Sequence, residues 1–292
     1  MKRRDFLKVT GAGLAGIPGI LEARTTLSAD PVALTRLTPN ITTSRIGMGT
    51  GVHGWNRQSN LTRMERAKAL DLIRYSYDRG IRFFDMADLY GTHGLVAEAL
   101  ADKPRESYAL GTKIWCRERG LPEGEANIPT EKQVERFLKE LKTDYIDLVQ
   151  IHCMSSAKWQ DEYRPHLDAL ENVKQKGWIR AHGVSCHTLA AARAAAESPW
   201  VDALHMRLNT EGLKMEGAWE DNVAVAERAQ QNGKGVIIMK VLGEGTIKDA
   251  SGRRKSTQAV ARLSAVDVMI VGFEERSHVD EFLTNVADAA KA

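Results

Sequence analysis

The chain has 292 residues, of which 43% are hydrophobic and 27% are charged, a composition typical of a folded globular protein and unlike that of disordered or collagen-like chains. Its formal net charge is +3, and residues 1–29 carry this whole excess, with basic side chains at five positions and acidic ones at two. The charges of the remaining chain balance, so the sequence has no basic stripe of the kind that binds nucleic acid.

Cysteines and apolar runs exclude two further classes of protein. Cys116, Cys153 and Cys186 are few, odd in number and without C-x-x-C spacing, which argues against a disulfide scaffold or a zinc ribbon. The longest apolar run, residues 9–21, is interrupted by glycine and proline and is too short to cross about 30 Å of hydrocarbon. We therefore expect no transmembrane segment.

The first segment, residues 1–29, has the pattern of an export signal. Arg3 and Arg4 precede a weakly apolar, glycine-rich stretch that ends in small polar residues, and this pattern resembles a twin-arginine signal. The resemblance implies a periplasmic or exported protein that uses the twin-arginine machinery; the alternative is a cytoplasmic protein with a basic tail. A G-x-G-x-x-G match at 11–16 is rejected as a nucleotide fingerprint because no strand precedes it.

From residue 45 onward, short β-rich runs alternate with stretches of helical periodicity. The predicted strands are 45–51, 81–87, 108–115, 145–154, 179–186, 201–208, 235–241 and 267–273. The predicted helices include 61–78, 130–141, 163–175, 189–198, 221–231 and 278–290. Eight such units in about 250 residues favour one closed (β/α)8 barrel of parallel strands with outer helices, a single domain over 30–292. An open doubly wound sheet is the alternative.

Functional residues of such a barrel gather at the C-terminal ends of the strands. Asp85, Lys113 and His152 lie at or near the ends of the second, third and fourth predicted strands, and Tyr90 follows Asp85 in the next loop. A lysine in an apolar strand needs an acid beside it, which predicts a buried Asp85–Lys113 pair. A phenol next to an ammonium is expected to have a lowered pKa, which makes Tyr90 a candidate proton donor.

The segments that hold these residues, DMADLYG at 85–91, TKIW at 112–115 and VQIH at 149–152, resemble the active-site segments of the aldo-keto reductase family. The likeness extends from about residue 44 to the C-terminal helix. It implies that Tyr90 donates a proton, Lys113 lowers its pKa, Asp85 holds the lysine and His152 orients a carbonyl. It also implies hydride transfer between NADP(H), or else NAD(H), and a small carbonyl or sugar-like substrate.

The family's cofactor positions match less well than its catalytic ones. The resemblance places the cofactor contacts at Gly49, Thr50, Ser185, Cys186, His205, Leu242, Gly243, Gly245, Arg276, His278 and Glu281. Cys186, Leu208 and Phe282 stand where the family has better hydrogen-bonding or stacking side chains, and only Arg276 and His278 are candidates to bind a 2′-phosphate. These departures leave open a non-catalytic nucleotide- or sugar-binding barrel.

Three large side chains, Trp55, Trp115 and Met154, are predicted to line a substrate pocket, although each also suits a core. His152–Cys153 and Cys186–His187 have the residue types of a Cys2His2 zinc site. Since neighbouring residues of a strand point to opposite faces, we expect no metal site there.

Overall fold

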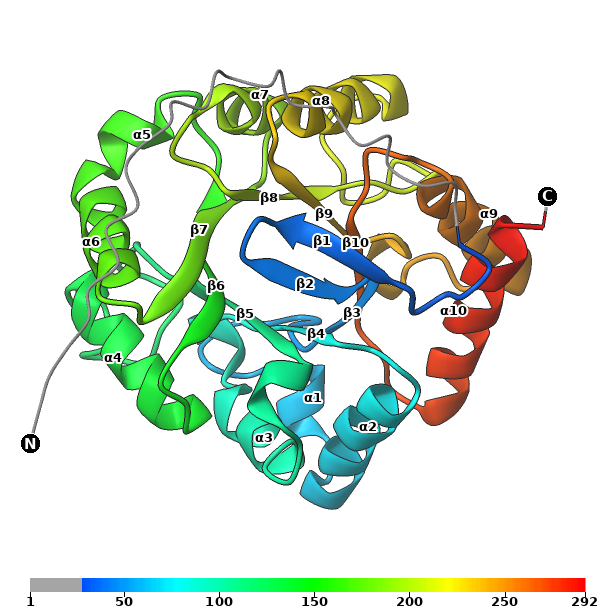
Figure 1. Cartoon of the computed structure of the whole chain (residues 1–292), viewed down its shortest axis with the longest axis horizontal. Helices are drawn as coiled ribbons and strands as arrows, with labels where there is room; N and C mark the ends of the chain where they lie inside the picture. The colour runs from blue at the N-terminus through cyan, green and yellow to red at the C-terminus, as the bar shows by residue number, and fades with distance from the viewer. Residues whose placement is uncertain (1–27, 292) are drawn as a thin grey trace, which may run out of the picture.

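The structure, a computed structural model, describes residues 28–291, which form one closed barrel surrounded by helices (Figure 1). All neighbouring barrel strands are parallel, in the order β10-β3-β4-β5-β6-β7-β8-β9. Their bounds are β3 Ile46–Gly49, β4 Phe83–Asp85, β5 Ala109–Ile114, β6 Ile146–Met154, β7 Ile179–Cys186, β8 Ala203–Arg207, β9 Gly235–Met239 and β10 Val268–Val271. The predicted (β/α)8 barrel is confirmed and the open sheet is wrong. Residues 1–27 of the predicted export signal lie outside the described residues.

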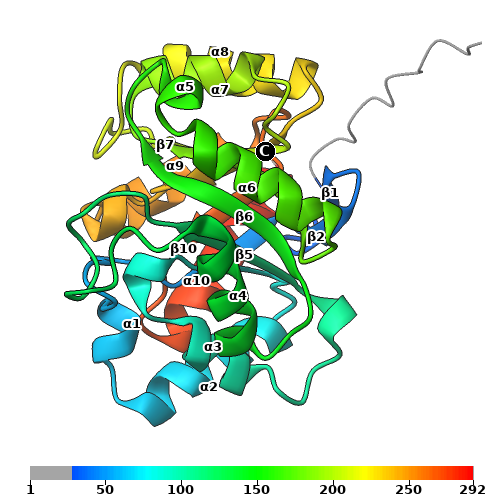
Figure 2. The same cartoon turned by 90° about the vertical axis from the view of Figure 1, so that its left-hand side faces the viewer.

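Helices cover the outside of the barrel, and α3, α4 and α6 cover the side that Figure 2 shows. The helices are α1 Asn60–Arg63, α2 Arg66–Asp78, α3 His93–Ala99, α4 Thr130–Leu141, α5 Trp159–Glu162, α6 Arg164–Gln175, α7 Leu189–Glu197, α8 Trp219–Gln231, α9 Ala250–Ala261 and α10 Arg276–Ala289. The single helix predicted at 61–78 is two helices, because the backbone of Met64 and Glu65 is not helical. Within residues 28–291, no helix has both the length and the hydrophobicity to cross a bilayer.

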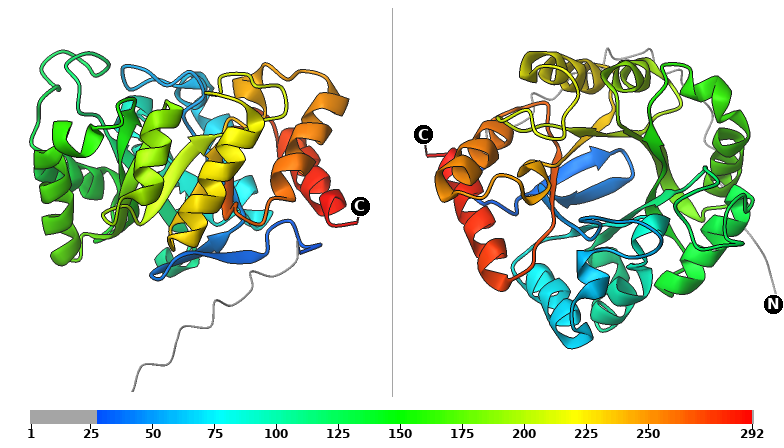
Figure 3. Two further views of the ribbon diagram at one scale, coloured as in Figure 1. Left: turned by 90° about the horizontal axis from the view of Figure 1, so that it is seen from above. Right: turned by 180° about the vertical axis from the view of Figure 1, so that it is seen from behind.

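A hairpin of β1 (Leu34–Thr38) and β2 (Ile41–Ser44) lies across one end of the barrel (Figures 1 and 3). Its two buried apolar side chains, Leu37 and Ile41, are 1% exposed and pack against residues that begin barrel strands, including Phe83 and Ala109. The hairpin therefore closes the N-terminal end of the barrel. We call the opposite end, where the strands finish, the open end.

Candidate active site

Four polar side chains converge at the open end of the barrel. Lys113 Nζ donates hydrogen bonds to Asp85 Oδ1 at 2.5 Å and to the Met86 carbonyl at 2.9 Å. Tyr90 lies in the short 3-10 helix Asp88–Tyr90, and its Oη is 3.3 Å from His152 Nε2. Lys113 Nζ lies 5.5 Å from the centroid of the Tyr90 ring. The four residues of the predicted constellation thus form one cluster, and the Asp85–Lys113 pair is buried.

Glycines hold the Tyr90 ring in this cluster. A Cβ at Gly51 would come within 2.1 Å of the ring, and one at Gly54 within 2.2 Å, so both glycines let the loop after β3 close over the phenol. Gly91, at φ +66, ends the 3-10 helix in a left-handed conformation that favours glycine. The loop glycine at position 51 therefore packs on Tyr90.

We expect Gly51→Ala to lower kcat by at least about tenfold, because the new methyl group displaces the Tyr90 ring from its position. Steady-state reduction of a small aldehyde measures the effect. Gly94→Ala is the matched control, since a Cβ at Gly94 meets nothing within 4 Å and alanine favours the helix. Equal activities of the two variants would show that Gly51 does not position Tyr90.

Burial dominates the electrostatics of the cluster. It raises the pKa of Tyr90 well above 10, and the negative charge of Asp85 adds to that rise. The predicted lowering of this pKa is wrong, because burial outweighs nearby positive charge, and the Lys113 ammonium is itself paired with Asp85 at 2.5 Å. Burial, followed by the charge of Lys113, lowers the pKa of His152 well below 6.5. At neutral pH the site therefore presents a protonated phenol next to an uncharged imidazole.

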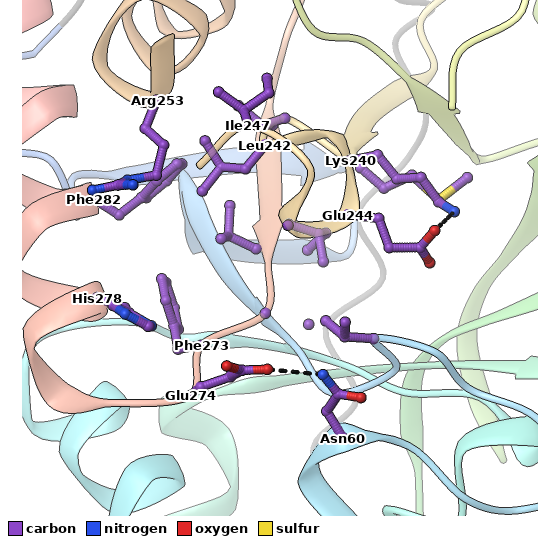
Figure 4. Close-up of a pocket in the computed structure, with 18 of the residues that line it drawn as sticks. Asn60, Lys240, Leu242, Glu244, Ile247, Arg253, Phe273, Glu274, His278 and Phe282 are labelled. Atoms are coloured by element: carbon purple, nitrogen blue, oxygen red, sulfur yellow. Dashed lines mark hydrogen bonds and ion pairs between the residues drawn. The ribbon is translucent and has the colours of Figure 1, made fainter. Parts of the chain in front are cut away.

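A cleft of about 470 Å³ leads away from this cluster between β9, β10 and α10. Asp85 and Tyr90 are among the residues that line it, and Arg253, His278 and Phe282 line it together on one side (Figure 4). Five predicted cofactor residues line the cleft, namely Gly49, Leu242, Gly245, His278 and Glu281. Gly245 has φ +81 and open space where a Cβ would stand, so its backbone is accessible to a ligand.

Three predicted cofactor residues that follow β3, β9 and β10 do not line the cleft. Thr50 is buried, and its hydroxyl donates to the Asp85 carbonyl at 2.9 Å. Gly243 packs against Leu213. Arg276 makes a bidentate ion pair with Asp71 on the outer surface, with one bond of 2.9 Å. The structure thus turns Arg276 away from the cleft, contrary to its predicted role in phosphate binding.

The predicted cofactor residues of β7 and β8 also lie outside the cleft lining. Ser185 Oγ accepts a hydrogen bond from the Cys153 backbone at 2.9 Å. Cys186, the next residue of the strand, packs in the apolar core between barrel and helices, which excludes the predicted cofactor contact. His205 is buried, with Nε2 3.4 Å from Asp85 Oδ1 but without a hydrogen bond. Burial, then the charge of Lys113, lowers the pKa of His205.

Several charged residues of the cleft were not predicted. Lys240, Lys248 and Arg253 all line it. Arg253 makes a bidentate pair with Glu281 at 2.7 and 3.0 Å, and Lys240 pairs with Glu244 at 3.0 Å. Lys240 directly follows β9, so the strand-end criterion that selects Asp85 could have selected it; Lys248 and Arg253 lie in a polar segment that carries no such signal.

Two tryptophans lie next to His152, and we call them the aromatic platform. The Trp115 ring packs edge-on against His152 with centroids 5.6 Å apart, and Trp55 packs edge-on against Trp115 at 5.9 Å. Trp55 is 53% exposed and Trp115 is 5% exposed, so the platform reaches solvent at Trp55. Met154, predicted beside them, has no exposed surface and belongs to the core; its predicted pocket role is wrong.

A bulge in β6 explains the misplaced methionine and creates a second cluster. The strand register shifts between Ile151 and Met154, and Cys153 has φ +64. Because of the bulge, the potential ligand atoms of His152, Cys153 and His187 all lie within 4.8 Å of one another. The expectation that His152 and Cys153 point to opposite faces is therefore wrong. Arg207 donates to His187 Nδ1 at 2.5 Å. The proton of that imidazole is therefore on Nε2, which faces Cys153 Sγ at 3.3 Å and is not free for a metal.

A chain of charged side chains supports Tyr90 from the other side. Asp88, two residues before Tyr90, accepts from Arg57 at 3.0 Å and from Arg136 at 2.7 Å. Arg136 continues to Glu140 at 2.8 Å, and Glu140 accepts from His93 at 2.7 Å. Asp88 is buried and has two cationic partners, so the network fixes the turn that carries Tyr90.

Glu140 gives this network a pH dependence. Burial opposes its ionisation, but the hydrogen bonds from His93 and Arg136 outweigh burial and lower its pKa from 4.5 to about 2. A lowered folded-state pKa stabilises the fold above pH 4.5, and this stability is lost as the pH falls from 4.5 to 2. We expect Glu140→Gln to cost about 1 kcal/mol at pH 7, allowing for solvent screening, and almost nothing near pH 2.

Urea unfolding at pH 7 and at pH 2.5 measures this difference. Glu135→Gln is the control, because Glu135 lies on the same helix but pairs with lysines at the surface, where ion pairs contribute little. A cost of Glu140→Gln that stays the same at both pH values would contradict the role of the carboxylate.

Comparisons with known proteins agree with this geometry. A family model described as "Aldo/keto reductase family" matches residues 45–287. The "Uncharacterized oxidoreductase YqkF" of Bacillus subtilis is 34% identical over 128 residues, which cover 41% of this chain and 40% of that protein. The "NADPH-dependent codeinone reductase 1-5" of Papaver somniferum is 26% identical over 196 residues, or 59% of this chain and 57% of that protein.

A solved structure matches over a greater length. The crystal structure of the Pseudomonas aeruginosa protein PA4992 has a TM-score of 0.72 and 25% sequence identity, and the match covers 92% of this chain and 98% of that one. The chain spans about half the length of the two curated relatives but nearly the whole of this structure. The barrel and its connections are therefore shared over almost the full chain.

Proposed function

The chain belongs to the aldo/keto reductase family, and we propose that it transfers a hydride between NADP(H) and an aldehyde or ketone, or the corresponding alcohol, with Tyr90 as proton donor. One observation carries the proposal. Tyr90, which lines a cleft of about 470 Å³, has its Oη 3.3 Å from His152 Nε2 and lies close to the buried Asp85–Lys113 pair. Two polar groups at that separation can both bond to one carbonyl oxygen.

The cleft has the chemical groups that a nicotinamide nucleotide needs. When bound, such a nucleotide supplies the hydride. Lys240, Lys248 and Arg253 are the cations that would hold its phosphates, and the rings of Phe273 and Phe282 give its adenine an apolar surface. The name of the Papaver relative, an NADPH-dependent reductase, supports NADPH over NADH.

The protein side of the reaction follows from protonation states. The raised pKa of Tyr90 keeps the phenol protonated, so its hydroxyl is available to protonate an oxygen that gains negative charge. His152, uncharged because its pKa is lowered, binds the same oxygen and orients it. Neither group has to move during the reaction. The polar groups that stabilise the developing negative charge are therefore already in position before the substrate binds. The Asp85–Lys113 pair holds the end of the cleft in place.

Nucleotide titration followed by tryptophan fluorescence tests the proposal. We expect NADPH to quench the fluorescence and to bind more tightly than NADH. Arg253→Met is expected to weaken NADPH binding by about tenfold, as for the loss of one charged hydrogen bond, whereas Arg276→Met, which removes only the outer pair with Asp71, is expected to have no effect. Lack of quenching by either nucleotide would favour a non-catalytic binding barrel.

We further propose that residues 1–29 direct export of the folded protein to the periplasm. The adjacent Arg3 and Arg4, ahead of a weakly apolar stretch, support this. Replacing both arginines by lysine is expected to retain the protein in the cytoplasm, as measured by cell fractionation and immunoblotting. An unchanged distribution would favour a cytoplasmic protein with a basic tail.

A further inference from the structure

An arginine stands next to the aromatic platform, on the loop that follows β5. The Arg117 side chain donates to the Cys153 carbonyl at 2.6 Å, and its guanidinium lies 5.2 Å from the centroid of the Trp115 ring. Cys153 directly follows His152 in the chain, and Trp115 also packs against His152. The guanidinium is thus held in one orientation, about one aromatic ring away from the histidine that faces Tyr90.

Charge pairing distinguishes Arg117 from three other cations around the open end. Lys113 pairs with Asp85, Arg207 with Glu216, and Lys240 with Glu244. Arg117 has no carboxylate partner within residues 28–291 and is only partly buried. One hydrogen bond to a carbonyl uses few of the five N–H donors of a guanidinium, so the remaining donors are available to an anion.

The charge of Arg117 reaches the catalytic neighbourhood. Burial is the main cause of the lowered pKa of His152 and of the lowered pKa of His187, about 3, and the positive charge of Arg117 contributes to both. Because no carboxylate of residues 28–291 pairs with Arg117, its positive charge is uncompensated. The surface beside the platform therefore attracts a negatively charged group and repels a cation.

Trp115 contacts both the Arg117 guanidinium and His152 and is itself only 5% exposed. Trp55 packs against Trp115 and extends this apolar contact to solvent. Within the described chain, the only exposed large hydrophobic side chain besides Trp55 is Leu34, on the hairpin at the opposite end. A planar or sugar-like substrate body would cover Trp55, which explains why this side chain stands exposed beside the site.

We propose that Arg117 forms a carboxylate-binding subsite, so that the preferred substrates are acidic carbonyl compounds with an anionic group about one ring's length from the reacting carbonyl. The inference rests on the proposed function, because it assigns one end of the substrate to Tyr90 and His152. A carboxylate matches the planar donor fork of arginine in a bidentate geometry. The aromatic platform packs against the substrate body between the two polar ends.

Two aldehydes of nearly equal shape test the subsite, 4-carboxybenzaldehyde and its neutral methyl ester. We expect the native enzyme with NADPH to have a kcat/KM about tenfold or more higher for the acid. Arg117→Met keeps the apolar stem over Trp115 and is expected to remove this preference through KM, by lowering kcat/KM for the acid much more than for the ester. Arg117→Lys is expected to keep part of the preference for the acid. Arg119→Met, which removes an exposed arginine two residues away, is the control and is expected to keep the whole preference.

A binding measurement separates this subsite from the proposed activity. Terephthalate, a dicarboxylate without a reducible carbonyl, is expected to quench the tryptophan fluorescence of the native protein and to bind about tenfold more weakly to Arg117→Met. Equal kcat/KM for acid and ester, or equal losses for both in Arg117→Met, would overturn the subsite. If neither aldehyde is reduced, the proposed function fails, while the terephthalate titration still decides whether Arg117 binds a carboxylate.

Discussion

Replacing Tyr90 by phenylalanine is expected to lower kcat by about three orders of magnitude, while the Kd for NADPH changes by less than about twofold. The substitution removes one oxygen and keeps the ring that packs against Gly51 and Gly54, so the fold and the cleft remain. What is lost is the hydroxyl, 3.3 Å from His152 Nε2, that would protonate the substrate oxygen. Single-turnover oxidation of bound NADPH measures the chemical step directly.

The pH profile adds a second readout for the same residue. The activity of a proton donor is lost as the pH rises through its pKa, and burial raises the pKa of Tyr90 well above 10. The native enzyme is therefore expected to keep its kcat up to about pH 10. Tyr163→Phe, at a partly buried tyrosine that precedes α6, is the matched control. A Tyr90→Phe rate like that of this control would remove Tyr90 from the mechanism.

Lys113→Met is expected to abolish activity and to cost about 3–5 kcal/mol of folding free energy at neutral pH, because it leaves a buried carboxylate without its ammonium. Lys113 is 1% exposed and Asp85 6% exposed, so water does not compensate the lost partner. Asp85→Asn with Lys113→Met removes both charges and is expected to recover most of the stability but none of the activity. Urea unfolding and NADPH oxidation measure the two properties separately.

The cost in the single variant also depends on pH. Burial already raises the pKa of Asp85, and Lys113 opposes that rise, so removal of Lys113 raises this pKa further. When the pKa of a carboxyl is higher in the folded than in the unfolded state, the fold is fully stable below the unfolded-state pKa. It loses stability as the pH rises through the folded-state pKa. The Lys113→Met deficit is therefore expected to grow with rising pH and the double variant to lack this trend. A pH-independent deficit would contradict the buried-pair explanation.

The barrel was predictable because its strands are buried on both faces. The run 145–154 is mostly apolar and 179–186 has apolar residues at four of its eight positions, and β6 and β7 occupy these ranges to within one residue. Strand ends then place Asp85, Lys113 and His152 at one end of the barrel without any knowledge of distances. Tyr90 is then found in the loop that follows Asp85.

Elements with little apolar surface were not predicted. The buried face of α9 includes Ser256 and Thr257 beside Val260 and Ala261, so its hydrophobic periodicity is weak. The β1–β2 hairpin has only two deeply buried large apolar residues, Leu37 and Ile41, although Pro39 and Asn40 between them form a turn signal. Alternation along β6 failed at Cys153 because a bulge reverses the side chains beyond it.

Burial and ion pairing between residues far apart in the chain could not be predicted from the sequence either. The rise of the Tyr90 pKa depends on the burial of the phenol and on the charge of Asp85 beside it, and the role of Arg276 depends on its pairing with Asp71, 205 residues away. Both facts depend on how the side chains are arranged in space and cannot be read from the residue types. Arg117 was not predicted either, since nothing in the sequence shows that its guanidinium is held beside Trp115 and the Cys153 carbonyl.

The hairpin at the closed end connects segments that lie far apart in the chain. Leu37 and Ile41 share their apolar cluster with Val268 and Ile270 of β10, and the ring of strands closes only when β10 pairs with β3. The hairpin therefore has its complete binding surface only when β10 is in place. A substitution that destabilises β10 is consequently expected to loosen the hairpin as well.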